Sequence, residues 1–200
     1  LITAMAVNDA GDSLLVGIAA ESGGSLHLVG PSRDPRRIIA AGRIVSIAFL
    51  PGASDAVIAD HDRNEVTLIR NVAESPATTL LGGEQAGIIQ PASVAASRDG
   101  LSVYVINGRR RRVTRLTVAG GAPSSIDCDC KPDRLTPLAG NAVFRLTAAS
   151  GSPLYIYDGD RETNGRLDPR IVAVPATSPA KITPTKPSRP LPQRRGRSAR

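Results

Sequence analysis

The sequence predicts an all-β protein of the β-propeller class, and three observations predict it. One pattern of strands and turns recurs four times along the chain, at intervals of 42, 47 and 40 residues. Turn-forming residues are frequent, with 19 glycines and 16 prolines. No segment has the apolar periodicity of a convincing helix. Four-stranded propeller blades repeat at about 40 to 45 residues, which matches the observed interval.

Each repeat begins with an apolar strand, a turn of small residues and a second strand rich in β-branched residues. The turns that set the interval lie at Gly11, Ala53, Gly100 and Gly140. The expected first and second strands are residues 4–7 and 13–16, 45–49 and 56–59, 93–96 and 102–106, and 135–138 and 142–146.

A third strand and a weaker fourth strand complete each repeat. The third strands are expected at residues 25–29, 65–69, 113–118 and 153–157, and the fourth at 37–40, 78–81, 124–127 and 170–174. The four blades would then span residues 1–42, 43–89, 90–130 and 131–176.

The last part of the chain differs in composition from the repeats. Residues 177–200 hold five prolines and seven of the 25 lysines and arginines, with no acidic or aromatic residue. Such a segment cannot form a core, so we expect a disordered Pro/Arg-rich tail. The remaining 18 cations balance all 18 acidic residues, which makes the body neutral. We therefore expect no specific nucleic-acid partner, only weak electrostatic binding by the tail.

The two cysteines are Cys128 and Cys130, too few for a disulfide-built scaffold. They form a disulfide if the protein is exported and stay a free pair if it is cytosolic. A zinc site needs about four ligands, and the only histidines are His27 and His61, so we expect no metal. No apolar run approaches the roughly 20 residues of a membrane span, and none is expected.

Residues 95–107, with the sequence AASRDGLSVYVIN, resemble the core of a YVTN-type repeat. Such repeats build bacterial propellers of the lactonase-like and NHL-like kind. The resemblance implies a ring of six to eight blades, export to the periplasm, the cell surface or the medium, and functions from lactone hydrolysis to adhesion and scaffolding. Because the chain opens at Leu1 within strand-like sequence and has four blades, we expect a fragment of such a ring. An open arc would leave a face of the first blade exposed.

Four consecutive arginines lie between the second and third strands of the third blade, on the rim of the propeller: Arg109, Arg110, Arg111 and Arg112. Guanidinium groups bind carboxylates and phosphates through paired hydrogen bonds, so this loop is a candidate binding site. The preceding Asn107-Gly108 also fits an ordinary hairpin turn with solvated charges, and both interpretations stay open.

The equivalent loop of the second blade contains Asp60, His61 and Asp62, so the rim is mixed in sign. This mixture argues against a continuous phosphate-binding track. His61 is a better functional candidate than His27, since a carboxylate neighbour favours a charged imidazole. A plain surface loop explains His61 as well, because no nucleophile accompanies it. His27 is expected to face a neighbouring blade.

Residues 158–168 place oxygen-bearing side chains at alternate positions, as calcium loops do. The twelfth position of the calcium register would be Ile171, where such a loop needs glutamate. A long hairpin turning at Asn164-Gly165 explains these residues better.

No nucleophile elbow, zinc-binding helix, phosphate loop or dinucleotide fingerprint occurs in the sequence. We therefore expect no catalytic residue and no cofactor. The leading hypothesis is a non-enzymatic scaffold or binding module that presents rim loops to an unknown protein or glycan partner. The alternative is a lactonase-like hydrolase whose catalytic residues lie mainly on other blades.

Overall fold

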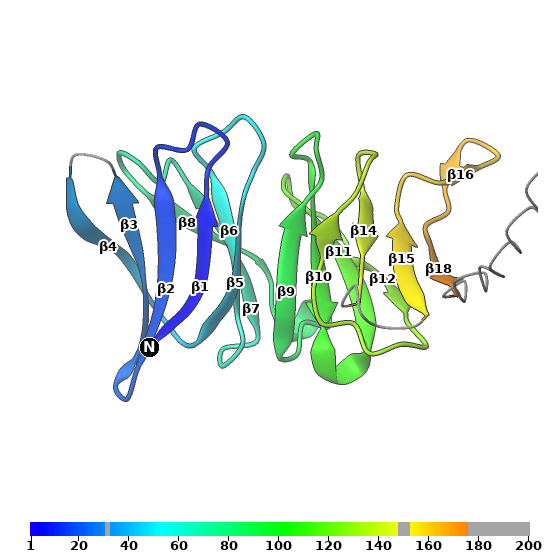
Figure 1. Cartoon of the computed structure of the whole chain (residues 1–200), viewed down its shortest axis with the longest axis horizontal. Coiled ribbons are helices and arrows are strands. Elements are labelled where there is room, and N and C mark those ends of the chain that lie inside the picture. Colours follow the sequence, from blue (N-terminus) through cyan, green and yellow to red (C-terminus); the bar gives the residue numbers. More distant parts are fainter. Residues whose placement is uncertain (31–32, 148–152, 176–200) are drawn as a thin grey trace, which may run out of the picture.

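The chain folds into four four-stranded antiparallel sheets, which follow one another along the long axis of the molecule (Figure 1). This computed structural model describes residues 1–30, 33–147 and 153–175. Within each sheet the strands are neighbours in chain order, which is the arrangement of a propeller blade. The expected all-β class with four blades is confirmed. The expected tail, residues 177–200, lies outside the described residues.

The strands agree closely with those expected. The first blade contains β1 (Ile2–Val7), β2 (Leu14–Ala20), β3 (Gly23–Gly30) and β4 (Arg33–Ala41). The second contains β5 (Ile44–Phe49), β6 (Ala56–Asp60), β7 (Glu65–Arg70) and β8 (Ala77–Gly82). The third contains β9 (Pro91–Ala96), β10 (Ser102–Asn107), β11 (Arg112–Thr117) and β12 (Ser124–Asp127). The fourth contains β13 (Thr136–Pro137), β14 (Val143–Arg145), β15 (Leu154–Asp158) and β18 (Arg170–Val174).

Between β15 and β18 lies a short hairpin of β16 (Glu162–Thr163) and β17 (Arg166–Leu167). It turns at Asn164 and Gly165, whose φ angles are 53° and 70°. These left-handed conformations suit an Asn-Gly turn, so the hairpin interpretation of this segment is confirmed.

The first strands of three blades carry a bulge at the same place. Pairing with the second strand slips between Ile2 and Ala4, between Ile44 and Ser46, and between Pro91 and Ser93. These positions are 42 and 47 residues apart, the same intervals as the turns. A shared bulge at a shared interval shows that the three sheets are copies of one structural unit.

Neighbouring blades bury apolar faces against each other. Leu15 and Leu26 of the first blade pack against Ile44 and Ile58 of the second. A second cluster joins blades two and three and includes Val57, Leu68, Val103, Val105 and Leu116. Alternating side chains thus supply both faces of each inner blade, as period-two strands dictate.

A third cluster joins blades three and four and holds most of the aromatic residues of the chain. The ring of Tyr104 lies 5.0 Å from that of Phe144 and 5.3 Å from that of Tyr157. Tilted pairs at these distances stabilise a core beyond their buried area. Burial raises the pKa of both tyrosines above the ordinary value of 10.0.

Two expectations need correction. Strand β13 covers only Thr136 and Pro137, whereas residues 135–138 were expected. The N–H of Leu135 is directed to Ser93 of the third blade, and Pro137 has no N–H to donate. His27 does not face the second blade, because Leu26 on the opposite side of β3 does. Its Nε2 lies 2.9 Å from Ser25 Oγ instead.

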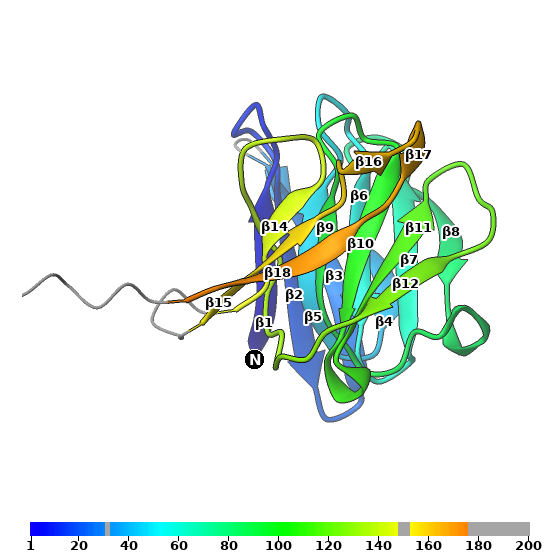
Figure 2. The same cartoon turned by 90° about the vertical axis from the view of Figure 1, so that its right-hand side faces the viewer.

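Because the strands run antiparallel, the described loops gather at two ends of the arc (Figures 1 and 2). We call one the linker end, which carries the connections between blades and the loops between second and third strands. The other is the hairpin end, which carries the loops between first and second strands. The described helices are 3-10 turns of three residues, and no described helix is long and apolar enough to cross a membrane.

Candidate functional site

Asp60 ends strand β6 at the linker end, where the structure buries it with 3% of its surface exposed. Its Oδ2 accepts a hydrogen bond from Gly42 N at 2.6 Å. Its Oδ1 accepts hydrogen bonds from the backbone N–H groups of Asp62 and Arg63. Asp60 therefore holds the connection between blades one and two, and it is not an exposed rim contact as the sequence predicted.

Asn107 takes the same position in the third blade, 47 residues later. It is fully buried; its Oδ1 accepts from Ile89 N at 3.0 Å and its Nδ2 donates to Thr114 Oγ1 at 2.8 Å. The two-residue Asn-Gly turn does not form, because Asn107 ends the strand and the chain turns after it. Only the shared interval of 47 residues could have identified Asp60 and Asn107 as equivalent.

His61 and Asp62 lie at the linker end with Arg43 of the preceding connection. His61 Nδ1 is 2.7 Å from Arg43 Nη2 and 3.0 Å from Asp62 Oδ1. The hydrogen bond with His61, aided by the charge of Arg43, holds the pKa of Asp62 below its ordinary value of 3.8. Nδ1 can serve only one of these partners at a time, as donor to Asp62 or as acceptor from Arg43. Arg43 Nε also lies 3.5 Å from Asp62 Oδ1, so the loop joins two blades and leaves little uncompensated charge.

The arginine loop, residues 108–112, also lies at the linker end. A 3-10 turn spans Gly108–Arg110, and Arg111 follows with a left-handed φ of 49°. Arg112 is paired, since its Nε lies 2.6 Å from Asp127 Oδ1. Arg109, Arg110 and Arg111 are exposed and form no ion pair with a described residue. The loop therefore presents three uncompensated cations.

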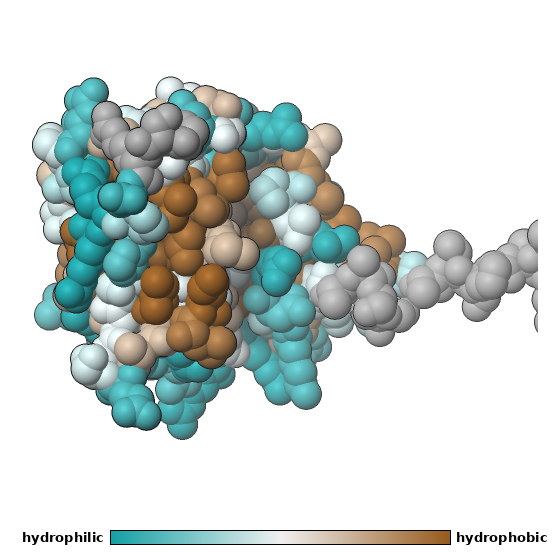
Figure 3. Space-filling model, turned by 60° about the vertical axis from the view of Figure 1, so that its left-hand side comes forward, coloured by the Kyte–Doolittle hydropathy of each residue, from teal (hydrophilic) through white to brown (hydrophobic). Residues whose placement is uncertain are grey.

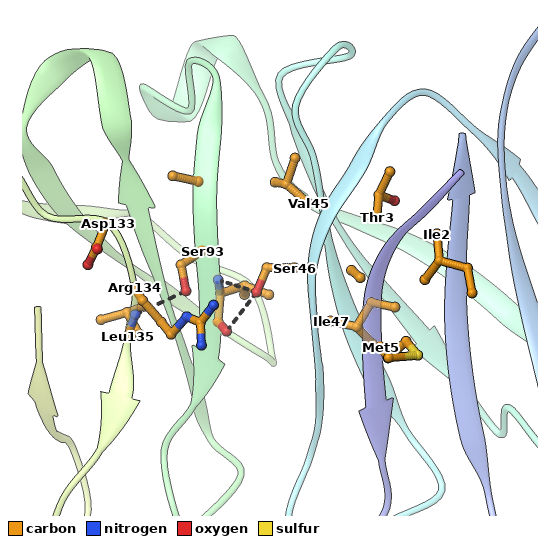
Figure 4. A pocket seen from close by; sticks show the side chains of 13 residues that line it. Ile2, Thr3, Met5, Val45, Ser46, Ile47, Ser93, Asp133, Arg134 and Leu135 are labelled. Carbon is orange, nitrogen blue, oxygen red and sulfur yellow. Dashed lines mark hydrogen bonds between the residues drawn. The ribbon is translucent and has the colours of Figure 1, made fainter. Parts of the chain in front are cut away.

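A hollow of about 540 Å³ lies along the starts of the inner strands (Figure 4). It is lined by residues 2–5 of β1, 45–47 of β5, 92–94 of β9 and the segment 133–135. Since first strands begin at the linker end, the hollow lies near that end. Arg134, which the sequence analysis did not single out, points into it between Ser93 and Ser46 (Figure 4).

The hydroxyls of Ser46 and Ser93, which line the hollow, both accept hydrogen bonds from the backbone. Ser46 Oγ accepts from Val94 N at 3.1 Å, and Ser93 Oγ accepts from Leu135 N at 3.0 Å. Neither histidine lines the hollow. A hydroxyl becomes a nucleophile only with a neighbouring base, so the described lining offers no catalytic dyad.

The arginine loop borders the hollow. Gly108 packs so closely on Ala92, a lining residue, that a Cβ at Gly108 would lie 3.3 Å from Ala92 Cβ. The loop and Arg134 thus lie beside the first residues of β9. Their guanidinium groups can bind a carboxylate or another anion by charge-assisted hydrogen bonds.

Cys128 and Cys130 are joined by a disulfide and are buried in the cluster between blades three and four. Cys128 N donates to Arg111 O at 2.7 Å, so the bridged segment anchors the end of the arginine loop. Among the described residues, no three His, Cys, Asp or Glu side chains are grouped as metal ligands.

Solved structures resemble this chain at low sequence identity. Virginiamycin B lyase from Staphylococcus aureus, in a catalytically inactive form with quinupristin, matches with a TM-score of 0.65 and 13% identity over 87% of this chain and 55% of its own. The nidogen/laminin complex matches at 0.63 and 14%, over 78% of this chain and 59% of that one. The fold is a β-propeller. A 6-phosphogluconolactonase-like protein from Bacteroides uniformis matches at 0.58 and 11%, over 88% and 57%.

No protein-family model matches the propeller sequence, and no curated protein matches it either. The chain spans about half the length of the solved structures that it resembles. By name these structures include a lyase, a lactonase and a nidogen/laminin complex, so the propeller fold alone does not select a function.

Proposed function

We propose that this chain is a non-enzymatic binding module whose linker end holds an acidic group of a protein or glycan partner. The observation that carries the proposal is the arginine loop. Arg109, Arg110 and Arg111 are exposed without a described ion pair, and Gly108 of the same loop contacts Ala92, which lines a hollow into which Arg134 points.

The loop is held in place before any ligand arrives. Asn107 is buried at its start, and Arg111 is bonded at its end to the disulfide-bridged segment. A preorganised loop loses little conformational entropy on binding, which favours affinity. Guanidinium groups match the planar, two-oxygen geometry of a carboxylate.

The alternative is a lactonase-like hydrolase with its catalytic residues mainly on other blades. The described residues favour binding over this alternative, since Ser46 and Ser93 bond to backbone and His61 is held by Arg43 and Asp62. An activity assay on lactones discriminates the two, because the binding module should give no turnover above the uncatalysed rate.

The proposal also includes the type of repeat and the cellular compartment. Residues 95–107 support a YVTN-type repeat, whose Asn107 has a defined role at the end of β10. The bridge between Cys128 and Cys130 supports export, since disulfides persist in oxidising compartments.

The test is calorimetric titration with a uronic-acid oligosaccharide, a glutamate-rich peptide and neutral counterparts, at about 0.15 M salt. Replacing Arg109, Arg110 and Arg111 together by serine should weaken binding of an acidic probe by at least about 10-fold, the loss of one charge-assisted bond. The matched control replaces Arg161, Arg166 and Arg170 by serine, which removes the same charge from blade four. Equal losses in both variants, or no binding of any acidic probe, would contradict the proposal.

A further inference from the structure

The outer edge of blade two differs in composition from the outer edges of the other blades. Each blade ends in an edge strand, and these are β4, β8, β12 and β18. Three of them carry charged residues, with the sequences RDPRRIIAA in β4, SSID in β12 and RIVAV in β18. Strand β8, with the sequence ATTLLG, has neither a charged residue nor a proline. Charges and prolines commonly prevent an edge strand from pairing with another chain, so β8 is the unprotected outer edge among the four blades.

The backbone of β8 is free on its outer side. Strand β8 pairs with β7 alone, with Ala77 opposite Arg70 and Leu80 opposite Thr67. No backbone group of a described residue outside this pair of strands hydrogen-bonds to residues 77–82. Figure 2 shows β8 at the outer side of the molecule, away from β1 and β5. Because alternate residues of an edge strand direct their N–H and C=O groups away from the sheet, these groups can pair with an added strand.

A groove of about 600 Å³ adjoins the end of β8. It is lined by Arg63, Glu65 and residues 80–86. Leu80, with 57% of its surface exposed, supplies an apolar wall. Leu80 and Glu65 lie on the same face of the sheet, because Leu80 pairs with Thr67 and side chains alternate along β7. A side chain opposite Leu80 on an added strand would therefore contact Leu80, and the next one on this face would point toward the carboxylates.

The groove carries uncompensated negative charge. Arg63 is neutralised by a buried carboxylate, since its Nε lies 3.8 Å from Asp60 Oδ2. Glu65 and Glu84 form no ion pair with a described residue. Glu84 Oε1 accepts a hydrogen bond from Asn64 Nδ2 at 2.7 Å, which holds this carboxylate in place before a ligand arrives. Charge complementarity therefore favours a cationic side chain in the partner.

The position of β8 within the arc distinguishes it from the open face of blade one. That face is apolar, with Ile2, Met5 and Val7 more than half exposed (Figure 3). A blade that continued the arc would cover it, so the face identifies no partner. Blade two lies between blades one and three (Figure 1), and a blade added at either end of the arc would not reach β8.

We propose that β8 and the adjoining groove are a docking site for an extended, basic peptide segment of a partner protein, which adds a fifth strand to blade two. Main-chain hydrogen bonds to β8 supply the affinity. An apolar side chain against Leu80 and a lysine or arginine two residues away supply the specificity. The site uses none of the residues assigned to the acidic ligand at the arginine loop, so the two proposals can fail separately.

Fluorescence anisotropy of the full chain with a labelled peptide tests the charge preference. The probe has about eight residues, alternating threonine and valine with a lysine at each end, so that a lysine reaches the carboxylates in either strand direction. We expect saturable binding, and Glu84→Lys should raise the Kd of this probe about threefold to tenfold. The same variant should lower the Kd of a probe whose lysines are replaced by glutamate. No saturable binding of the lysine probe would overturn the proposal.

The matched control for charge is Glu162→Lys, which makes the same change on the exposed β16–β17 hairpin. It should leave both Kd values within about twofold, because charges on a distant loop are screened at about 0.15 M salt. Equal effects of Glu84→Lys and Glu162→Lys would show only a response to net charge and would overturn the groove as the site.

Two measurements test the mode of docking. Leu80→Ser should raise the Kd of the lysine probe about fivefold or more by removing an apolar contact, whereas Leu101→Ser, at a residue 64% exposed in a hairpin-end turn, should not. Hydrogen–deuterium exchange of the full chain should slow at residues 77–80 when the probe is bound, because main-chain pairing protects amides. Unchanged exchange at these residues with the probe bound would overturn strand addition. Dimerisation of the chain through β8 without any probe would overturn the choice of partner.

Discussion

The hydroxyl of Ser46 hydrogen-bonds to the backbone of Val94 in the next blade. Ser46 Oγ accepts a hydrogen bond from Val94 N at 3.1 Å and lies 3.4 Å from Val94 O, to which it donates. Ser93, one repeat later, accepts from Leu135 N at 3.0 Å. In both places a serine on the first strand of one blade accepts a hydrogen bond from a backbone N–H of the next blade. These bonds join consecutive blades along the hollow.

Ser46→Ala should lower the free energy of unfolding by about 1 to 2 kcal/mol, because it leaves the polar backbone of Val94 without its partner. Urea denaturation at neutral pH measures the loss. Ser54→Ala is the control, since Ser54 is exposed and its hydroxyl bonds to no described residue, and it should stay within about 0.5 kcal/mol. Equal values for the two variants would mean that the bridge adds nothing to stability.

Asp99 joins the turns of blades three and four, where its Oδ2 accepts from Asn141 Nδ2 at 2.9 Å. Burial on its own raises the pKa of Asp99, but hydrogen bonds from Ser97, Leu101 and Asn141 more than offset it. They hold the pKa of this carboxyl below its ordinary value of 3.8. The folded state thus prefers the ionised form of Asp99.

Because the folded pKa lies below the unfolded value, the stabilisation by Asp99 is fully present above about pH 4 and is lost as pH falls through the folded pKa. Asp99→Asn should therefore lower the urea midpoint at pH 7. The gap between variant and wild type should narrow between pH 4 and the acid limit of folding. A gap that stays constant over this range would contradict the assignment.

Gly24 lies against the connection to the second blade, where a Cβ would collide with the backbone oxygen of Gly42. Gly42 cannot retreat easily, since Asp60 holds its N–H. Gly24→Ala should cost more than about 3 kcal/mol or prevent folding, because the clash is with backbone. Gly30→Ala, in the same strand, has its nearest such contact at 4.0 Å and should cost no more than about 1 kcal/mol. Equal melting temperatures for the two variants would contradict the close approach of Gly24 to the backbone oxygen of Gly42.

The strands were predictable from the sequence because β-branched runs alternate with turn residues at a constant interval. The hydrogen bonds between blades were not predictable, because single serines within the strands make them and no local sequence pattern marks these serines. Ser46 and Ser93 are separated by the repeat interval of 47 residues, and this was the one signal that could have paired them.

The candidate site was predictable in part. The sequence places Arg109, Arg110 and Arg111 in a loop, but Arg134 stands beside Asp133 ahead of the first strand of the fourth repeat, where no pattern distinguishes it. Only the curvature of the arc brings Arg134 beside β5 and β9. Asp60 was predicted in a rim loop because its segment is equivalent to the arginine loop of the third blade; its burial accompanies three backbone N–H groups that converge on its carboxylate.

Binding to duplex DNA should depend on residues 177–200, because these carry the seven cations in excess of a neutral body. A chain ending at Ala176 should lose most of its affinity in fluorescence anisotropy. For the full chain, the logarithm of affinity should fall with the logarithm of salt by about 0.9 per phosphate neutralised. Tight binding by the shortened chain at about 0.15 M salt would require a basic face on the propeller itself.

The most direct test of the binding module is to map its ligand by two-dimensional NMR of the ¹⁵N-labelled full chain, titrated with a uronic-acid oligosaccharide. The proposal predicts that the amide signals of residues 108–112 and of Arg134 shift together and saturate at one probe concentration. The signals of the hairpin-end turns, residues 8–13 and 97–101, should stay in place. Shifts confined to the hairpin end, or no shift near the arginine loop when the probe is bound, would contradict the account.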